Sequence, residues 1–400
     1  MPGVLPDGEP VPADGSLPAS ALGRTGPFGV YVHVPFCASR CGYCDFNTYA
    51  PGEGVERGGY VDSVLAELDL ARRVLGERGP VDTVFVGGGT PTLLAPGELG
   101  RILSSVDKAW GLAADAEVTT EANPESVDPA SLRALRAAGY TRISLGMQSA
   151  AAHVLMTLDR RHTAGRAVAA ALEARDAGFA HVNLDLIYGT PGERPEDFAA
   201  SLDAAVAAGV DHVSAYALIV EDGTRLAARI RRGELPYPDD DVAADRYLAA
   251  EAALSGSGLT WYEVSNWALG DAARCRHNLI YWTGGDWWGL GPGAHSHVGG
   301  VRWWNVKHPT AYAARLAAGE SPAQARERLT PAERHTEDVM LRLRLATGLP
   351  LAALSTDGRA AAAGAVAGGL LDPAAHRAGR AVLTLRGRLL ADAVVRDLLP

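Results

Sequence analysis

The stretch VYVHVPFCASRCGYCDFNTYA, residues 30–50, joins a β-branched apolar run to a loop that contains three of the protein's four cysteines. Cys37, Cys41 and Cys44 form the pattern CxxxCxxC, and Cys275 is the one thiol elsewhere in the sequence. A chain of 400 residues can bury a core without disulfides, so four cysteines do not indicate a disulfide scaffold. The cluster therefore indicates a metal site or a catalytic site in a reducing compartment.

The composition narrows the class of protein. Residues 1–26 combine scattered prolines and acidic residues without a basic start or an apolar core, which predicts a disordered leader rather than a signal peptide. The longest apolar stretch, residues 360–371, is too short to span a bilayer. A formal net charge of -10 argues against a nucleic-acid-binding protein, because such proteins usually carry a basic excess. We therefore expect a soluble cytoplasmic protein.

Short β-branched or apolar runs alternate with alanine- and leucine-rich amphipathic segments along the first half of the chain. The six runs are residues 29–34, 82–88, 117–122, 142–149, 181–189 and 212–220. Alternation of strands and helices at this spacing predicts parallel strands joined by right-handed crossovers. The sequence therefore predicts an α/β fold, an open or partial (β/α)6 barrel, with functional residues at the carboxyl ends of its strands.

Unusual residues gather where the predicted strands end. The cysteine loop follows the first strand, the run GGGTPT (87–92) follows the second, and Glu121, Gln148 and Asp185 lie at or near the ends of the next three. Each has an ordinary explanation, because GGGTP lacks the spacing of a dinucleotide site and suits a tight turn, and either carboxylate can cap the next helix. Their shared position at the strand ends favours a common functional site.

Three thiolates in one loop are compatible with two kinds of metal site. Zinc needs a fourth ligand, for which His33 is a candidate, although it lies within the predicted strand. A [4Fe–4S] cluster usually takes four thiolates, so three leave one iron free. That iron can chelate the amino and carboxylate groups of S-adenosylmethionine (SAM), whose reductive cleavage yields a carbon radical. The spacing favours the iron–sulfur cluster over zinc and over a purely structural thiol cluster.

The motifs taken together resemble a known family. YVHVPFC (31–37), GGGTPT, SLGMQS (144–149), LDRRHT (158–163), NLDLIYGTPG (183–192) and HNLIYW (277–282) occur in this order. In this set of motifs the chain resembles the radical SAM superfamily. Within that superfamily it is similar to the oxygen-independent coproporphyrinogen III oxidase-like family, and closest to the heme chaperone branch of that family. The resemblance runs from Tyr31 to the C-terminus, and it implies a partial radical SAM barrel followed by a small helical, winged-helix-like domain.

The resemblance also implies roles for single residues. Cys37, Cys41 and Cys44 would bind a [4Fe–4S] cluster. The implied SAM contacts are Tyr31, Tyr43, Gly88, Gly89, Thr90, Glu121, Gln148, Arg160 and Asp185. Glycine suits a backbone that approaches a ligand, and the planar fork of arginine suits the SAM carboxylate. Without the resemblance, Arg160 would be interpreted as a solvated charge at a helix end, because a second arginine adjoins it.

The most informative departure from the oxidases of this family follows Cys44. Those enzymes carry a further cysteine two positions on, whereas this sequence has Phe46, in the CDF form of the chaperone branch. The missing thiol disfavours porphyrinogen decarboxylation and leaves cluster and SAM binding intact. Two functions from different classes therefore stand: a heme chaperone that hands heme to an acceptor protein, and a SAM-dependent coproporphyrinogen III oxidase.

A second region of interest holds seven of the eight tryptophans, between Trp261 and Trp304. Within it HNLIYW resembles the HNxxYW motif of the chaperone branch, which implies heme-binding residues at His277, Asn278, Tyr281 and Trp282. Neutral imidazole commonly ligates heme iron, so we expect an exposed His277 that is an iron ligand or its essential neighbour. The alternative is a closing strand of the barrel with core tryptophans and a hydrogen-bonded His277. Cys275 is expected to be an ordinary semi-buried thiol.

We expect three regions: a disordered leader at 1–26, a radical SAM partial barrel with the Trp-rich extension at 27–305, and a helical C-terminal domain at 306–400. The last region has no basic stripe, which disfavours DNA binding and favours a cover over the barrel mouth. The implied partners are heme, a heme-acceptor protein and an electron donor for the cluster. The sequence predicts no nucleic-acid partner and no transmembrane segment, and it leaves peripheral membrane contact open.

Overall fold

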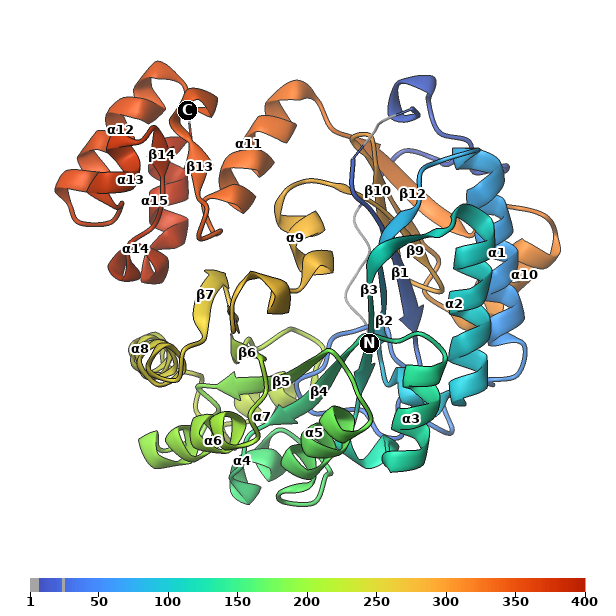
Figure 1. The fold of residues 1–400 in the computed structure, drawn as a ribbon, viewed down its shortest axis with the longest axis horizontal. Coiled ribbons are helices and arrows are strands. Elements are labelled where there is room, and N and C mark those ends of the chain that lie inside the picture. Colours follow the sequence, from blue (N-terminus) through green and yellow to red (C-terminus); the bar gives the residue numbers. More distant parts are fainter. Residues whose placement is uncertain (1–6, 24–25, 400) are drawn as a thin grey trace.

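The computed structural model describes residues 7–23 and 26–399. In this part of the chain, twelve strands form one sheet in the order β12-β11-β10-β9-β1-β2-β3-β4-β5-β6-β8-β7. The central strands β9 and β1 to β6 run parallel, and antiparallel strands extend the sheet at both edges. The predicted α/β fold with parallel barrel strands is confirmed, and Figure 1 shows the sheet curved into a partial barrel.

The six predicted strands occur at nearly the predicted positions. They are β1 Phe28–Val34, β2 Val81–Gly88, β3 Leu112–Ala122, β4 Arg142–Gln148, β5 His181–Tyr188 and β6 His212–Ala217. The strands that extend the sheet are β7 Thr260–Glu263, β8 Asn266–Ala268, β9 Asp286–Leu290, β10 His295–Val298, β11 Val301–Asn305 and β12 Ala323–Arg328. Most barrel strands are buried along nearly their whole length, as expected for parallel strands covered by helices.

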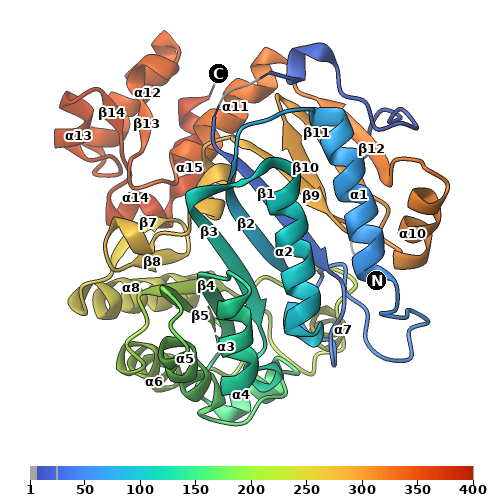
Figure 2. The ribbon, with the colours of Figure 1, turned by 45° about the vertical axis from the view of Figure 1, so that its right-hand side comes forward.

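Helices surround the barrel. They are α1 Tyr60–Leu75, α2 Pro96–Trp110, α3 Pro129–Ala137, α4 Ala152–Thr157, α5 Arg166–Asp176, α6 Pro195–Ala207, α7 Arg225–Arg231, α8 Asp240–Gly256 and α10 Pro309–Ala317. Of these, α4 and α7 lie at the rim beside the cysteine loop, and the others pack around the sheet. Figure 2 shows α1 and α2 side by side on one face of the sheet, where α1 packs on β9 and α2 on β2. In α1 the buried side chains of Val61, Val64 and Leu68 recur at helical spacing, which directs one apolar face to the sheet. Among the described residues, no helix has the length and hydropathy needed to cross a bilayer.

The Trp-rich region does not form a closing strand at the HNLIYW motif. Those residues lie in a short helix, α9 Arg276–Trp282, which sits on the face of the sheet opposite α1 and α2 (Figure 1). The neighbouring tryptophans divide between the two faces. Trp288 and Trp303 join the large core cluster that α1 contributes to, and Trp287 contacts Tyr281 of α9. The motif is therefore inside the concave face of the sheet.

The C-terminal part is helical and has its own hydrophobic cluster. Its elements are α11 Pro331–Arg342, β13 Leu349–Pro350, α12 Thr356–Ala367, α13 Pro373–Arg377, β14 Arg380–Ala381, α14 Leu385–Leu389 and α15 Ala391–Leu398. Buried residues such as Leu349, Leu371 and Val394 form a cluster distinct from the barrel core. The expected helical C-terminal region, with a two-stranded β13–β14 pair, is confirmed, whereas the exact domain boundaries stay a prediction.

The leader differs from the disordered tail that its composition predicts. Residues 7–23 lie against the β12 edge of the sheet, where the backbone of Glu9 pairs with that of Arg326. The Glu9 carboxylate also accepts hydrogen bonds from Arg326 and Arg328, at 2.9 and 3.0 Å. The physical reason is that an exposed sheet edge offers unpaired backbone groups, which a polar segment can satisfy without an apolar core of its own. Residues 1–6 and 24–25 of the expected leader lie outside the described residues.

A buried carboxylate ties α1 to the antiparallel extension. Glu67, only 1% exposed, accepts hydrogen bonds from the Gly291 backbone at 2.8 Å, from Asn305 at 2.7 Å and from Tyr312 at 2.5 Å. Burial raises the pKa of Glu67 to about 7, and the three donors oppose that rise. The carboxylate therefore joins four segments that are distant in sequence.

We expect Glu67→Ala to lower the free energy of unfolding by about 2–4 kcal/mol, because three buried donors lose their acceptor at once. Denaturant unfolding followed by circular dichroism measures this change. Asp69→Ala is the matched control, since Asp69 lies exposed on the same helix and should change stability by less than about 0.5 kcal/mol. Equal effects of the two substitutions would contradict the role given to Glu67.

Candidate cofactor site at the carboxyl ends of the barrel strands

The cysteine loop leaves β1 at the carboxyl end of the barrel and folds back on itself. The Cys37 backbone N–H donates to the Tyr49 carbonyl at 3.0 Å, and the Tyr49 N–H donates to the Pro35 carbonyl at 2.7 Å. Farther along, the Asn47 side chain donates to the carbonyls of Pro292 and Lys307, at 2.9 and 2.8 Å. The loop is thus fixed both to its own start and to the antiparallel extension of the sheet.

The glycine run after β2 holds the first residues of this loop. The N–H groups of Gly89 and Thr90 donate to the carbonyls of Val34 and Phe36, each at 2.7 Å. A Cβ atom on Gly89 would lie 2.5 Å from the Phe36 oxygen, and Gly88 has a φ of +107° that favours glycine. The glycines are therefore required by close contacts within the protein itself. Their predicted contact with SAM stays a prediction.

Two carboxylates face the interior of the barrel at adjoining positions. Glu121 accepts a hydrogen bond from the Gly88 N–H at 3.0 Å, and its pKa is raised to about 8 by burial and by the nearby charge of Asp185. Asp185 accepts from Ser144 at 2.9 Å and from Asn183 at 2.8 Å, and burial raises its pKa as well. Neither carboxylate caps the next helix. Two carboxyl groups held in this way can accept hydrogen bonds from hydroxyl or amino groups of a ligand.

Arg160 points into the site, which is not the solvated position that its neighbours alone suggested. Its guanidinium donates to the Gly146 carbonyl at 2.9 Å and to the Cys41 sulfur at 3.5 Å. Its buried Nε has no partner among the described residues, so at least this donor remains for a ligand. The residues Gln148 and Asp159 adopt left-handed backbone conformations, with φ of 66° and 53°. Such conformations are unfavourable for most residues and are often found at functional sites.

The two predicted tyrosine contacts lie in different surroundings. The Tyr31 hydroxyl is hydrogen-bonded to Nδ1 of His33 at 2.9 Å, while Nε2 of His33 is 2.9 Å from the Asn47 carbonyl oxygen. Burial lowers the pKa of His33 to about 4. Because both nitrogens of His33 are engaged, it is not available as a fourth zinc ligand. Tyr43 packs on an apolar cluster at the barrel rim, which includes Leu158.

The three thiols of the loop do not form a ready-made site for a single ion. Within the described residues, no three His, Cys, Asp or Glu side chains converge closely enough to bind one metal ion. A tetrahedral zinc needs all its sulfur ligands about 2.3 Å from one point, whereas a cubane binds each thiolate through a different iron. Burial raises the pKa of Cys37, and it raises the pKa of Cys44 to about 11, so cluster binding must displace these protons.

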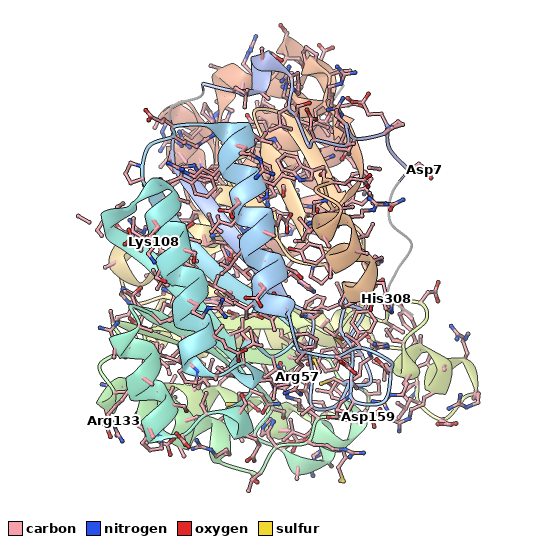
Figure 3. All side chains as sticks on the ribbon, turned by 90° about the vertical axis from the view of Figure 1, so that its right-hand side faces the viewer. Asp7, Arg57, Lys108, Arg133, Asp159 and His308 are labelled. Carbon is pink, nitrogen blue, oxygen red and sulfur yellow. The ribbon has the colours of Figure 1, made fainter. Side chains whose placement is uncertain are left out.

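The outer side of the cysteine loop is open. A pocket of about 500 Å³ is lined by Cys41, Cys44 and the 59% exposed Phe46, together with charged side chains such as Asp159. Figure 3 shows Asp159 at this end of the barrel and Lys108 toward the opposite end. The cysteine sulfurs therefore lie between the polar interior of the barrel and the surface.

The predicted heme residues lie at the amino ends of the strands, away from the cysteine loop. The prediction of an exposed His277 is wrong, since this side chain is only 1% exposed. Its Nδ1 is 2.7 Å from the Thr83 hydroxyl and its Nε2 is 2.8 Å from the Tyr281 hydroxyl, while its ring stacks on Phe85. Burial lowers its pKa to about 3. His277 is therefore a neutral, fully hydrogen-bonded core residue, as the alternative interpretation held.

Glu117, at the start of the buried part of β3, positions the motif helix. Its carboxylate accepts hydrogen bonds from the first two N–H groups of α9, those of Arg276 and His277, each at 3.0 Å. A carboxylate suits this position because the amino end of a helix carries partial positive charge. Cys275 donates its thiol to the same carboxylate at 3.6 Å and is fully rather than half buried. Cys275 is thus remote from the cysteine loop.

Sequence reasoning missed several residues that support the site. The Asn183 side chain links Asp185 to the buried His212, whose Nδ1 lies 2.7 Å from Asn183 Oδ1. Tyr216, at the end of β6, is 41% exposed and lies two residues beyond Ser214, which is paired with Asp185 in the sheet register. The alternation of side chains along β5 and β6 places Asn183 and Asp185, and likewise Ser214 and Tyr216, on one face of the sheet. That signal was present in the sequence.

Comparisons with known proteins place the chain among radical SAM proteins. Residues 31–205 match the model of the radical SAM superfamily. A protein of Mycobacterium tuberculosis named heme chaperone HemW is 58% identical over 96% of this chain and 97% of its own length. The HemW of Bacillus subtilis is 31% identical over 80% of this chain and 84% of its own. The solved structure of coproporphyrinogen III oxidase from Escherichia coli, a radical SAM enzyme, superposes with a TM-score of 0.78 at 24% identity, covering 93% of this chain and 90% of that one, which shows the same fold.

We expect Gly89→Ala to release the start of the cysteine loop, because the added methyl group would collide with the Phe36 carbonyl. The thiols of the cofactor-free protein should then react with a disulfide reagent such as DTNB several times faster than those of the wild type. Gly97→Ala is the control, since a Cβ atom at Gly97 meets nothing within 4 Å. Unchanged thiol reactivity in Gly89→Ala would contradict the contact described above.

Proposed function

The chain belongs to the HemW family of radical SAM proteins, and on that premise we propose that it is a heme chaperone, which binds heme and transfers it to an acceptor protein. The observation that carries the proposal is the 58% identity to the Mycobacterium tuberculosis heme chaperone over nearly the whole of both chains. Phe46 supports it, because this chain lacks the additional cysteine expected of a coproporphyrinogen III oxidase. We further propose that it acts in the cytoplasm, with an electron donor for its cluster.

Cys37, Cys41 and Cys44 are proposed to hold a [4Fe–4S] cluster, with SAM in the adjoining interior of the barrel. When bound, this pair supplies reductive cleavage of the sulfonium, and the chain's own residues bind and orient the cofactors. The guanidinium of Arg160 keeps at least its Nε–H donor beside Cys41, which suits a carboxylate. Glu121 of β3 and Asp185 of β5 offer acceptors on the two strands that flank β4, and these suit ribose hydroxyls or an amino group. The contacts proposed for Tyr31, Tyr43, Gln148 and the glycine run complete this set.

The motif helix α9 is proposed to shape the heme site rather than to lie exposed. His277 then acts as an essential neighbour of the iron ligand, because both of its ring nitrogens are already hydrogen-bonded. Burial raises the pKa of Glu263 to about 8, and the nearby side chains of Asn278 and Trp282 oppose that rise. Tyr281 contacts Trp287 with ring centroids 4.6 Å apart. Tyr281 is the motif residue through which α9 reaches the aromatic face of the extended sheet.

Reconstitution with iron and sulfide under anaerobic conditions should give about four irons and four sulfides per chain, the stoichiometry of one cubane. We expect Cys41→Ala to lose the cluster, because only two thiolates of the loop remain. Cys275→Ala should keep full iron content, since its thiol lies against Glu117 away from the loop. Iron and sulfide analysis with absorbance spectra measures the outcome. Zinc in place of iron after anaerobic expression would contradict the cluster assignment.

The chaperone function and the oxidase function predict different outcomes in two assays, hemin transfer and coproporphyrinogen III turnover. We expect the reconstituted protein to bind hemin and to pass it to a heme-free acceptor such as apomyoglobin. With SAM, a reductant and coproporphyrinogen III, it should form no protoporphyrinogen IX, since the additional motif cysteine is replaced by Phe46. Turnover on the order of one per second would assign the chain to the enzymes instead. Failure to bind hemin at all would overturn the chaperone proposal.

A further inference from the structure

A heme that is handed on requires an iron ligand at the surface, and His277 does not supply one. All eleven histidines lie among the described residues, and most of them are engaged through at least one ring nitrogen. Within the part of the chain that the structure describes, no hydrogen bond or ion pair involves the ring nitrogens of the other four, which are His162, His295, His335 and His376. Of these four, His295 is the one that is exposed and that contacts another aromatic ring.

His295 begins β10 on the same concave face as the motif helix. Its strand neighbour two residues on, His297, contacts the ring of Trp287, so alternation places His295 on that face as well. Trp287 in turn contacts Tyr281 of α9. Trp288, the next residue along β9, packs on the other face of the sheet, in the large hydrophobic cluster between the sheet and its covering helices. His295, Trp287 and Tyr281 therefore face the same space.

Two tryptophans hold His295 in place. Its ring lies nearly parallel to that of the buried Trp304, at 28° with centroids 5.9 Å apart. The indole N–H of Trp287 donates to the His295 backbone carbonyl at 3.0 Å, which ties β9 to β10 at this point. A ring that is oriented by packing and has an unoccupied nitrogen can ligate a metal that arrives from solvent. The half-buried Trp287 and Tyr281 offer flat apolar surface beside it.

We propose that His295, and not His277, provides the axial nitrogen ligand to the heme iron, with Trp287 and Tyr281 in contact with the porphyrin. The proposal rests on the proposed heme chaperone function and names the ligand within it. The HNxxYW helix then contributes through Tyr281, and His277 holds that tyrosine by its hydrogen bond at 2.8 Å. A single ligand on an open face also suits transfer, because an acceptor can displace it without unfolding the site.

Hemin titration of the full chain, followed by the Soret band, tests this assignment. We expect His295→Ala to bind hemin at least tenfold more weakly and with a shifted Soret maximum. Free imidazole added to His295→Ala should restore the wild-type maximum, because it replaces the missing ligand; a purely structural role of His295 would not respond to imidazole. His277→Ala should weaken binding through α9 while its Soret maximum stays at the wild-type position.

His376→Ala is the matched control, since this half-buried histidine of α13 also has free ring nitrogens but lies in the C-terminal helices. It should titrate as the wild type does. An unchanged Soret maximum and affinity in His295→Ala, with normal binding by the wild type, would overturn the ligand assignment and leave the chaperone function standing. Imidazole rescue of His277→Ala in place of His295→Ala would return the ligand to the motif. A wild type that binds no hemin would refute the proposed function itself.

Discussion

The pairing of β1 with two parallel neighbours is the constraint on which the rest of the structure depends. In this pairing Tyr31 lies opposite Phe85 of β2 on one side and opposite Gly289 of β9 on the other. Parallel pairing directs the carboxyl ends of all these strands to one edge, so the cysteine loop has to emerge beside the glycine run. The same strand joins the barrel to the Trp-rich extension. Both functional regions therefore share one wall.

The two ends of that wall differ in how well their carboxylates are compensated by hydrogen-bond donors and positive charge. At the carboxyl ends, Glu121 and Asp185 are half-buried with too few donors to balance their charge, and both pKa values rise. At the amino ends, Glu117 is compensated by helix N–H groups and by Arg142, which lies 3.7 Å away. Uncompensated polar groups are costly in a folded core and are usually retained where a ligand satisfies them. This contrast favours ligand binding at the carboxyl ends of the strands and a structural role for the residues at the amino ends.

Burial also separates the roles of the histidines. His33, His212 and His277 are buried with both ring nitrogens bonded, and burial lowers the pKa of each. They are neutral connectors that fix loops, strands and α9 in place. His295 lies on the same sheet with free nitrogens. A motif match does not distinguish these histidines, because it compares residue types and not their surroundings.

The sequence by itself determined the parallel barrel, the cysteine loop and the strand ends at which Glu121 and Gln148 lie. These depend on local patterns: period-two and helical alternation, the CxxxCxxC spacing and the glycine run. Only the tertiary structure decided that residues 7–23 cover the β12 edge, that Arg160 turns toward Cys41, and that His277 is buried while His295 is exposed. Each of these follows from contacts between segments far apart in the chain, such as Glu117 with α9 and Glu9 with Arg326. A local pattern carries no information on such contacts, because burial depends on which distant segments pack together.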